Sequence, residues 1–393
     1  MSKYIFAQVV DFIPRYQFDK LVRKYQGDYH IHELSCYNQF LHLLFGQLTA
    51  CSSLRDICLC LSAHSKSLYR LGFGNTVDSS SLSRANERRN YRIYEELGYY
   101  LIRLVRPYYT GVALIGIEAN NPLFALDSTT ISVSIKLATW AYGKYSKGAV
   151  KMHTLLDLRG AIPTQIYITD GKWHDSNMLD LLNIQANAIY TADKAYVDFA
   201  ALSNIHKAGA YFVMRPKDNM KYEVIEPFSD GERGSTICGD YAIRLTGYKS
   251  QRLYGDNMRL IRVRDSNNNE IIDFITNNWE LSALDIANIY RHRWDIETFF
   301  KWVKQNIVIK QLWGYSENAV KTHIWIAICA YLLIALIKAR YHSSYTTTEV
   351  ATLVCVSALE RMDLEKLLTI PNEQLCELSQ NQNVKEQQTC LFL

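Results

Sequence analysis

The chain changes character at residues 123–131, which read LFALDSTTI. This stretch is short, apolar and rich in β-branched residues, so it favours a buried strand. The segments after it alternate between strand-like and helix-like patterns, which indicates a mixed α/β core. Further strands are expected at 151–158, 162–169, 188–192 and 211–214, and helices near 174–182 and 196–208.

The regions on either side of this core have different patterns. Residues 1–110 read as helical, with dense apolar stretches at 34–48 and 79–105. Residues 217–280 lose the helical period and contain several glycines and the run DSNNN, which favours a β-rich insertion with hairpins. Helices return after residue 283.

The N-terminal third is modestly basic. Residues 1–110 contain 14 Lys and Arg and 9 Asp and Glu, whereas the 393-residue chain has a net charge of only +4. The segments 53–62, 66–71 and 79–90 have the spacing of a helix-turn-helix. The last of these helices would present basic side chains to DNA phosphates; a helical bundle with a solvated basic face is the alternative. The side chains concerned are Arg84, Asn86, Arg88 and Arg89.

Composition excludes several classes of protein. Hydrophobic residues make up 48% and charged residues 21%, which is typical of a globular chain. The longest apolar run, Ile324 to Ile337, has fourteen residues, fewer than the roughly 20 that span a bilayer. The nine cysteines include no C-x-x-C pair, so reduced and mostly buried thiols are expected, not disulfides or a zinc site. We therefore expect a soluble intracellular protein.

Three acids stand out by their context. Asp127 lies inside an apolar strand-like stretch, Asp193 ends the strand-like segment AIYTAD, and Glu297 lies in a helix-like stretch. A carboxylate within or directly after an apolar strand is costly unless it is paired or binds a cation. Strand ends of an α/β sheet are also where functional sites form. Each acid alone could instead be a turn or cap residue.

The predicted helix at 288–305, NIYRHRWDIETFFKWVKQ, carries a polar stripe beside its apolar one. Four polar side chains at offsets 0, 3, 7 and 14 fall within an arc of about 60° at 100° per residue. Such a stripe suits a site that reads phosphate, although a solvated, salt-bridged face would also produce it. The four residues are Tyr290, Arg293, Glu297 and Lys304.

This spacing, Tyr-x2-Arg-x3-Glu-x6-Lys, resembles the Y-R-E-K signature of bacterial insertion-sequence transposases of the DDE type, the group numbered four. Asp127 in LDST and Asp193 in TADKAYVD are similar to the first and second catalytic aspartates of that family. The resemblance is strong over residues 120–340. It implies an α/β fold: a ribonuclease-H-like mixed-sheet catalytic core with a β-rich insertion, preceded by a helical DNA-binding domain.

The resemblance divides the chain into five parts. Residues 1–115 would form the helical DNA-binding domain, with a possible helix-turn-helix, and 116–216 the first part of the catalytic core. Residues 217–280 would be the β-rich insertion, and 281–340 the second part of the core with the Glu helix. Residues 341–393 would be C-terminal helices and a polar tail.

The resemblance also assigns roles to residues. Asp127, Asp193 and Glu297 are expected to be catalytic and to bind two Mg2+ ions, for which Mn2+ can substitute. Asp127 would lie between the metals, and each of the other acids would complete one metal site. Water or a 3′-hydroxyl would then attack a phosphodiester in line with the leaving oxygen. Further contacts to DNA or phosphate are expected from Tyr290, Arg293, Lys304, Lys194, Arg84 and Arg88.

Some residues near the motifs have two interpretations. Trp294 is expected in the core, with stacking on a displaced base as the alternative. His174 and Asp175, in DGKWHDS, are expected to form a helix cap or a structural bond, with support of the site as the alternative. Asp157 is expected to be a turn residue, and Asp170 and Asp198 to be caps or supporting residues.

By resemblance, the protein is a DNA transposase that binds double-stranded DNA as terminal inverted repeats and as target. It would cleave the element ends and join their 3′-hydroxyls to target DNA. Pairing of two ends implies a homodimer on DNA, and no membrane partner is expected. The location would be the bacterial cytoplasm, at the nucleoid. The alternatives are a metal-dependent ribonuclease-H-like DNA nuclease without strand transfer, and a non-catalytic DNA-binding protein derived from a transposase.

Overall fold

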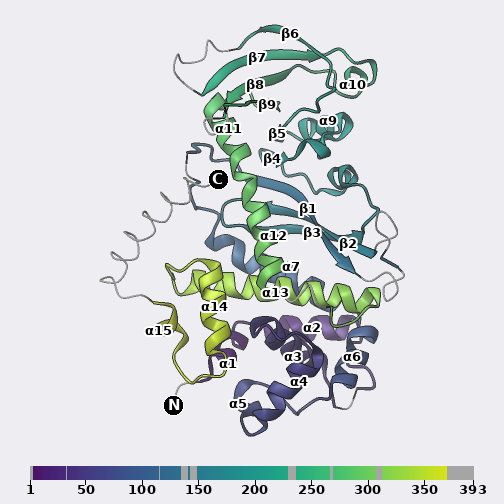
Figure 1. The fold of residues 1–393 in the computed structure, drawn as a ribbon, viewed down its shortest axis with the longest axis vertical. Helices are drawn as coiled ribbons and strands as arrows, with labels where there is room; N and C mark the ends of the chain where they lie inside the picture. Colours follow the sequence, from purple (N-terminus) through teal and green to yellow (C-terminus); the bar gives the residue numbers. More distant parts are fainter. Residues whose placement is uncertain are drawn as a thin grey trace. The chain divides into compact units, whose positions relative to one another are not determined.

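The chain folds into two compact units (Figure 1). The sheet unit comprises Arg106–Lys301, and the helical unit comprises Met1–Val105 and Trp302–Leu393. The helical unit is therefore built from both ends of the chain. The computed structural model describes residues 3–31, 33–114, 116–133, 140–141, 148–228, 236–265, 269–306 and 312–369.

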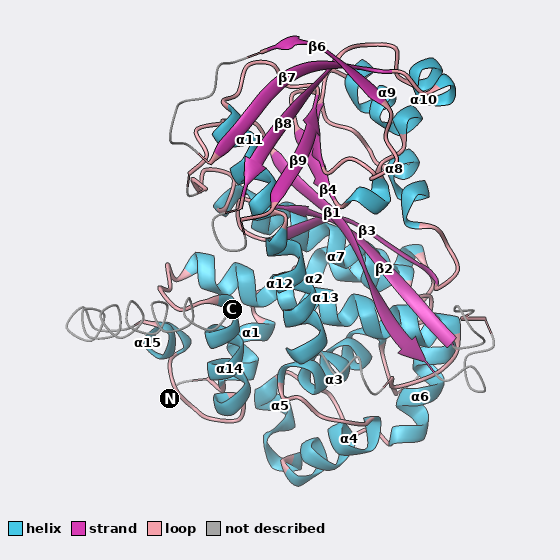
Figure 2. Cartoon of the chain, turned by 45° about the horizontal axis from the view of Figure 1, so that its top comes forward, coloured by secondary structure: helices cyan, strands magenta, loops and turns pink. Residues whose placement is uncertain are grey.

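The sheet unit is organised around one mixed sheet, drawn in magenta in Figure 2. Among the described residues it has nine strands, in the order β3-β2-β1-β4-β5-β9-β8-β7-β6. The strands are β1 (Leu123–Val133), β2 (Gly148–Asp157), β3 (Ile162–Asp170), β4 (Ile189–Ala192), β5 (Tyr211–Met214), β6 (Tyr222–Pro227), β7 (Ile237–Leu245), β8 (Met258–Arg264) and β9 (Ile271–Thr276). The helices are α8 (Met178–Leu181), α9 (Phe199–Lys207), α10 (Tyr248–Leu253), α11 (Ala283–His292) and α12 (Trp294–Asn306), whose last residues belong to the helical unit.

The first five strands lie at the positions that the sequence predicts. β2 pairs antiparallel with both β1 and β3, whereas β1, β4 and β5 are parallel neighbours. All five predicted strands and the helix before β5 are confirmed. This mixed sheet is consistent with a ribonuclease-H-like core.

The segment expected to be a β-rich insertion extends the same sheet. β9 pairs antiparallel with β5, and β8, β7 and β6 follow outward from it. The predicted strands are therefore confirmed. The six-residue helix α10 interrupts them and is not predicted, because it is too short to show a helical period in the sequence.

The core of the sheet unit lies around the parallel strands. All four residues of β4 are buried, as expected for a strand covered on both faces. α9 begins at Asp198, whose carboxylate accepts hydrogen bonds from the Ala200 and Ala201 N–H groups, so the predicted cap is confirmed. The buried apolar cluster includes Phe124, Leu126, Tyr190, Ala192, Ala201, Leu202, Ile205, Phe212 and Met214.

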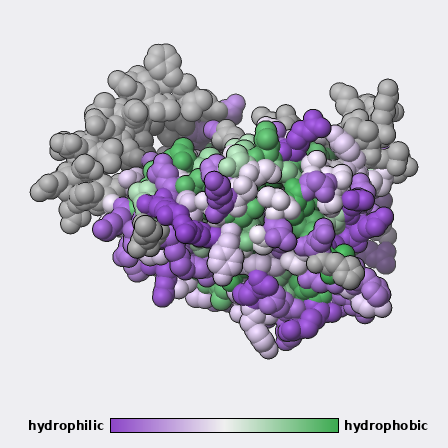
Figure 3. All heavy atoms as spheres, turned by 90° about the horizontal axis from the view of Figure 1, so that it is seen from below, coloured by the Kyte–Doolittle hydropathy of each residue, from purple (hydrophilic) through white to green (hydrophobic). Residues whose placement is uncertain are grey.

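The helical unit contains the remaining helices. A long helix near the C-terminus, α13, packs against α3, α6, α7 and α14. In the view of Figure 3, hydrophilic side chains cover most of the visible described surface, with apolar side chains between them. The helices are α1 (Ile5–Val10), α2 (Arg15–Lys24), α3 (Cys36–Leu48), α4 (Leu54–Ala63), α5 (Leu68–Leu71), α6 (Ser79–Arg88), α7 (Arg92–Val105), α13 (Glu317–Arg340), α14 (Thr347–Ser357) and α15 (Leu364–Leu368).

α13 is the central helix of this unit. It is long and apolar enough to cross a membrane by composition alone, but 94% of its most apolar 18-residue window is buried inside the protein. The helix is apolar around its whole circumference, which is typical of a helix in a protein core. Among the described cysteines, Cys36, Cys51, Cys58 and Cys329 are buried free thiols, and Cys60 and Cys238 are exposed.

The helical stretch expected at 79–105 is broken into α6 and α7. Asn318 of α13 satisfies main-chain groups at this break. Its side-chain oxygen accepts a hydrogen bond from the Tyr91 N–H at 3.1 Å. Its amide donates to the carbonyls of Asn86 and Arg89. The break is therefore fixed by a partner more than 200 residues away in sequence.

Two residues expected on the DNA-facing side of α6 are buried instead. The Asn86 oxygen accepts a hydrogen bond from Gln39 of α3 at 2.7 Å, and Arg89 donates to the Gln39 oxygen at 2.7 Å. The prediction that Asn86 and Arg89 are presented to DNA is therefore wrong, because both anchor α6 to α3. Arg84 and Arg88 are exposed.

We predict that Gly98→Val destabilises the helical unit. A Cβ at Gly98 of α7 would lie 2.9 Å from two ring carbons of the buried Trp325 of α13. Overpacking of this kind costs about 1–3 kcal/mol in the free energy of unfolding, which urea titration measures. The control Gly111→Val, where a Cβ would meet no atom within 4 Å, should change stability little. Equal losses in both variants would contradict tight packing between α7 and α13.

Candidate active site

The register of the parallel strands brings two of the expected acids to one level of the sheet. Leu126 of β1 pairs with Ala192 of β4, and the next residues are Asp127 and Asp193. Because the two strands run in the same direction, Asp127 within β1 and Asp193 directly after β4 lie at the same height on adjacent strands.

The Asp127 carboxyl lies in a poorly solvated position. Its side chain is 24% exposed, and one oxygen accepts a hydrogen bond from the Ser128 N–H at 2.8 Å. Burial raises the pKa of Asp127 to about 6. The carboxylates of Glu297 and Asp193 act in the same direction, whereas Arg293 opposes them. The three acids are therefore close enough to interact electrostatically.

Arg293 lies between two of these acids. Its Nη2 is 3.1 Å from Glu297 Oε1, and its Nη1 is 3.9 Å from Asp127 Oδ2. Arg293 is 7% exposed, and its Nε has no hydrogen-bond partner in the described part of the chain. The arginine thus offers a buried, partly unused set of donors beside the carboxylates.

The predicted single helix at 288–305 is wrong, because it divides at Arg293. The Arg293 N–H donates to the Tyr290 carbonyl, three residues back, where α11 ends. α12 then begins at Trp294, which is 60% exposed, so the expectation of a core tryptophan is also wrong. The Arg293 guanidinium carbon lies 5.4 Å from the Trp294 ring centroid.

The other members of the predicted stripe have different surroundings. Tyr290 is 7% exposed and packs on Phe274, with ring centroids 4.8 Å apart. Burial raises the pKa of Tyr290. Lys304 is exposed and belongs to the helical unit. Lys194, next to Asp193, pairs with Asp218 at 3.0 Å.

Asp175 supports the strand that carries Asp127. It accepts hydrogen bonds from the Ser128 hydroxyl at 2.8 Å and from Lys151 Nζ at 2.9 Å. Burial alone would raise the pKa of Asp175, but these hydrogen bonds lower it. The expected structural bond of Asp175 is therefore confirmed, and it is made to the strand that carries Asp127.

Lys151 and His153 of β2 are site residues that the sequence prediction missed. His153 is fully buried, and its Nδ1 lies 3.6 Å from Asp175 Oδ1. Burial lowers the pKa of His153 to about 4, so the ring is neutral at pH 7. A signal was present in KMHTLLD, where a lysine and a histidine interrupt an apolar strand.

Arg215 was missed as well. Met214 of β5 pairs with Ala192 of β4, so Arg215 follows its strand at the level of Asp193. Arg215 is exposed and lowers the pKa of Tyr290, although burial of the tyrosine dominates. An arginine directly after the apolar strand YFVM is the same kind of signal as Asp193 after AIYTA.

The acids have the chemistry of a divalent metal site. Hard cations such as Mg2+ prefer carboxylate oxygens, which Asp127, Asp193 and Glu297 supply. Within the described ranges, however, no three His, Cys, Asp or Glu side chains converge closely enough to hold an ion. Glu297 is instead directed to Arg293, whose positive charge lies beside both Glu297 and Asp127. The donor set fits the metal, and Glu297 would have to leave Arg293 to complete it.

The remaining acids have structural roles. Asp157 accepts a hydrogen bond from the Arg159 N–H at 3.1 Å, as expected for a turn residue. It also pairs with Arg106 at 3.0 Å. Asp170 accepts hydrogen bonds from two N–H groups in the turn after β3, so it caps that turn.

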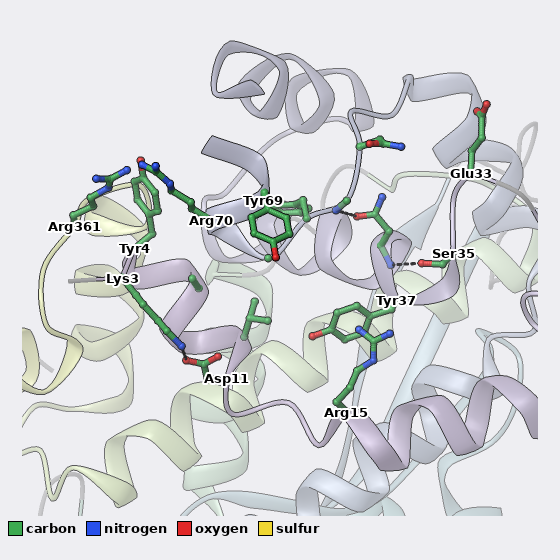
Figure 4. Close-up of a pocket in the computed structure, with 17 residues that line it drawn as sticks. Lys3, Tyr4, Asp11, Arg15, Glu33, Ser35, Tyr37, Tyr69, Arg70 and Arg361 are labelled. Carbon is green, nitrogen blue, oxygen red and sulfur yellow. Dashed lines mark hydrogen bonds and ion pairs between the residues drawn. The ribbon is translucent and has the colours of Figure 1, made fainter. Parts of the chain in front are cut away.

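Two open cavities are lined by described residues of the helical unit. Figure 4 shows the larger, of about 1000 Å³, where Arg15 lies over the Tyr37 ring and Lys3 pairs with Asp11. The smaller, of about 690 Å³, is lined by both Arg84 and Arg88. The two exposed arginines of α6 therefore face one concave surface.

Residues 118–333, more than half of the chain, match the transposase DDE domain, so the chain belongs to this family of transposases. Residues 1–74 match a domain of unknown function (DUF4372). The expected class of enzyme is therefore confirmed.

Three bacterial proteins named as transposases are similar to this chain. The chain is 30% identical over 251 residues to y4zB of Sinorhizobium fredii, covering 63% of this chain and 69% of y4zB. It is 31% identical over 215 residues to a probable transposase for insertion sequence element IS5377 of Geobacillus stearothermophilus, covering 54% and 56%. It is 26% identical over 267 residues to a protein of Synechocystis sp. named for insertion sequence element IS4SA, covering 67% and 73%.

A structural likeness extends to a piggyBac transposase synaptic complex with hairpin DNA. It covers 93% of this chain and 80% of that chain, at 10% identity and a TM-score of 0.43.

We predict that Asp127→Asn changes how stability depends on pH. The pKa of Asp127 is about 6 in the folded protein against an ordinary value of 3.8, so the folded state binds this proton more tightly. As the pH rises from about 4 to about 6, the wild type loses this proton, and its free energy of unfolding falls. The variant has no carboxyl group at this position, so it does not show this fall.

In metal-free buffer, the stability of Asp127→Asn relative to the wild type should rise by about 2 kcal/mol between pH 4 and pH 7.5. Urea titrations at the two pH values in the presence of a chelator measure this change. A difference between the proteins that is independent of pH would show that the Asp127 carboxyl has an ordinary pKa.

Proposed function

We propose that this protein is an insertion-sequence transposase of the Y-R-E-K group that binds terminal inverted repeats, cleaves the element ends and joins their 3′-hydroxyls to target DNA. The observation that supports the proposal is that Asp127, within β1, and Asp193, directly after β4, lie at the same level of the sheet. Glu297 lies on the other side of Arg293 from Asp127 and would complete the acidic triad.

In this proposal the three acids hold two Mg2+ ions, or Mn2+ in their place. Asp127 contributes to both metal sites, and Asp193 and Glu297 to one each. The ions, when bound, would activate the attacking oxygen and stabilise the leaving one. Release of Glu297 to the metal would free Arg293 to make a bidentate contact with a DNA phosphate. Asp175 holds the side chain of Ser128, the neighbour of Asp127 within β1, and so helps to orient this part of the strand.

The other expected DNA contacts belong to the same proposal. Tyr290, Lys304 and Lys194 would contact DNA phosphates or sugars near the cut. Arg84 and Arg88 would hold the element end, and pairing of two ends would make the protein a homodimer in the bacterial cytoplasm. The domain scheme with boundaries near 115, 216, 280 and 340 stays a prediction. The tail after residue 369 lies outside the described residues.

Two alternatives use the same fold. A nuclease without strand transfer needs the same acids, and a non-catalytic DNA-binding protein needs none of them. Similarity to proteins named for insertion sequences favours strand transfer. The buried Asp127 would be a needless cost in a protein that only binds DNA.

We predict that Glu297→Gln abolishes cleavage of element ends while DNA binding persists. Purified protein, Mg2+ and DNA with the element's own ends are incubated, and cleaved and joined products are resolved on a gel. The wild type should give end-specific cuts and joined strands. The control Asp157→Asn should keep this activity, because Asp157 ends β2 opposite Phe124, three residue pairs along the strand from Asp127.

Each other outcome identifies a different protein. Cuts without end preference or joining would indicate the nuclease, and binding without cuts would indicate the non-catalytic protein. Full activity in Glu297→Gln would remove Glu297 from the site.

We predict that Arg84→Ala with Arg88→Ala weakens binding of the element end. For each arginine that no longer meets a phosphate, the slope of log K against log salt should become shallower by about 0.9. Fluorescence anisotropy at several salt concentrations measures the slope. Arg55→Ala with Arg70→Ala removes the same charge from other helices of the unit. An unchanged slope in the Arg84/Arg88 variant would exclude this face from DNA contact.

A further inference from the structure

The sheet unit has a second cationic surface that the catalytic proposal does not use. A cavity of about 580 Å³ lies between the start of α9, the segment 217–221 and α10. Three lysines, Lys217, Lys221 and Lys249, line it. α9 and α10 are in contact; α9 packs beside β5 and α10 beside β7 (Figure 1).

The positive charge of this cavity is not balanced by its neighbours. None of the three lysines has a hydrogen-bond or ion-pair partner for its side chain in the described part of the chain, and all three are exposed. Among the described residues that line the cavity, Asp198 is the one acid, and its carboxylate accepts hydrogen bonds from the N–H groups at the start of α9. Nearby Asp218 is paired with Lys194.

Three like charges around a concave surface repel one another unless an anion lies among them. A single surface lysine needs no explanation, but three around one cavity favour a ligand with several negative charges. Tyr248, which also lines the cavity, is 82% exposed. An exposed ring beside lysines can pack on a sugar or a base, as in proteins that bind nucleic-acid strands.

Lys217 and Lys221, which line the cavity, closely follow β5 in sequence, and β5 ends at the level of the acids. Arg215 follows β5 at the level of Asp193, and Lys217 comes two residues later. Basic side chains therefore lie along the chain from the end of β5, at Arg215, to the cavity. This continuity selects a phosphodiester backbone over other polyanions such as acidic peptides, because the strand ends hold the acids proposed to cut DNA.

We propose that the DNA backbone contacts a surface formed by Arg215, Lys217, Lys221 and Lys249. This surface would hold the DNA strand where it runs away from the proposed catalytic acids. The surface belongs to the sheet unit and is distinct from Arg84 and Arg88 of α6. The inference rests on the proposed function, since it places the DNA path relative to the acids.

The test uses full-length protein carrying Lys221→Gln with Lys249→Gln. A labelled duplex with the element end and its flank is titrated by anisotropy between 50 and 200 mM salt. The expected result is a slope of log K against log salt that is shallower by about 1.8, which is about 0.9 for each lysine that no longer meets a phosphate. End cleavage in Mg2+ should fall with the binding and recover at raised protein concentration.

The matched control is Lys207→Gln with Arg252→Gln, which removes the same charge from exposed positions on α9 and α10 that do not line the cavity. Thermal unfolding confirms that both variants are folded; should the lysine variant unfold, Lys217→Gln alone is tested for a slope change of about 0.9. Equal slopes in variant and control would overturn the inference.

The two proposals can fail separately. A shallower slope in the variant, with no end cleavage by the wild type, would leave the surface standing and remove the transposase proposal. End cleavage by the wild type, with an unchanged slope in the variant, would support the transposase proposal and overturn the proposed contact surface.

Discussion

The parallel register of β1, β4 and β5 is the constraint on which the candidate site depends. Paired residues Leu126, Ala192 and Met214 are each followed by a charged residue, so two acids and an arginine lie at one level. A slip of one residue would turn every side chain of a strand to the other face. β4 is buried along its whole length, so such a slip would bury the Asp193 carboxylate in the core. The apolar packing of β4 thus fixes the positions of the charged side chains at this level of the sheet.

The charge balance of the site follows from this placement. Asp127 is buried enough to hold its proton up to about pH 6, and Arg293 supplies positive charge to both Asp127 and Glu297. Asp175 in turn is held by Lys151 and supports Ser128. A cationic ligand would relieve the cost of ionising Asp127. Carboxylates in this position thus lower the stability of the folded protein, which is usual where a site must bind a charged ligand.

Sequence patterns predicted the strands and the acids but not the contacts between distant segments. The strands β1 to β5 have dense apolar stretches bounded by turns, so their local pattern was sufficient. The break at Arg293 and the burial of Asn86 were not predictable, because each depends on the local packing of a folded unit. Arg89 looks like a DNA ligand in sequence, yet it binds Gln39, fifty residues away. Arg215 had the same local signal as Asp193, but only the register of β5 shows that it lies at the level of the acids.

The division of the helical unit between both ends of the chain has a consequence for synthesis. α3 and α7 are made early, but α13, on which they pack, emerges about 200 residues later. At 5–20 residues per second this is a delay of roughly 10–40 s. The sheet unit can complete its fold in that interval, while the apolar faces of the first helices stay uncovered on the ribosome. The nascent chain is therefore most in need of a chaperone before residue 340 is made, and a truncation before α13 would leave that need permanent.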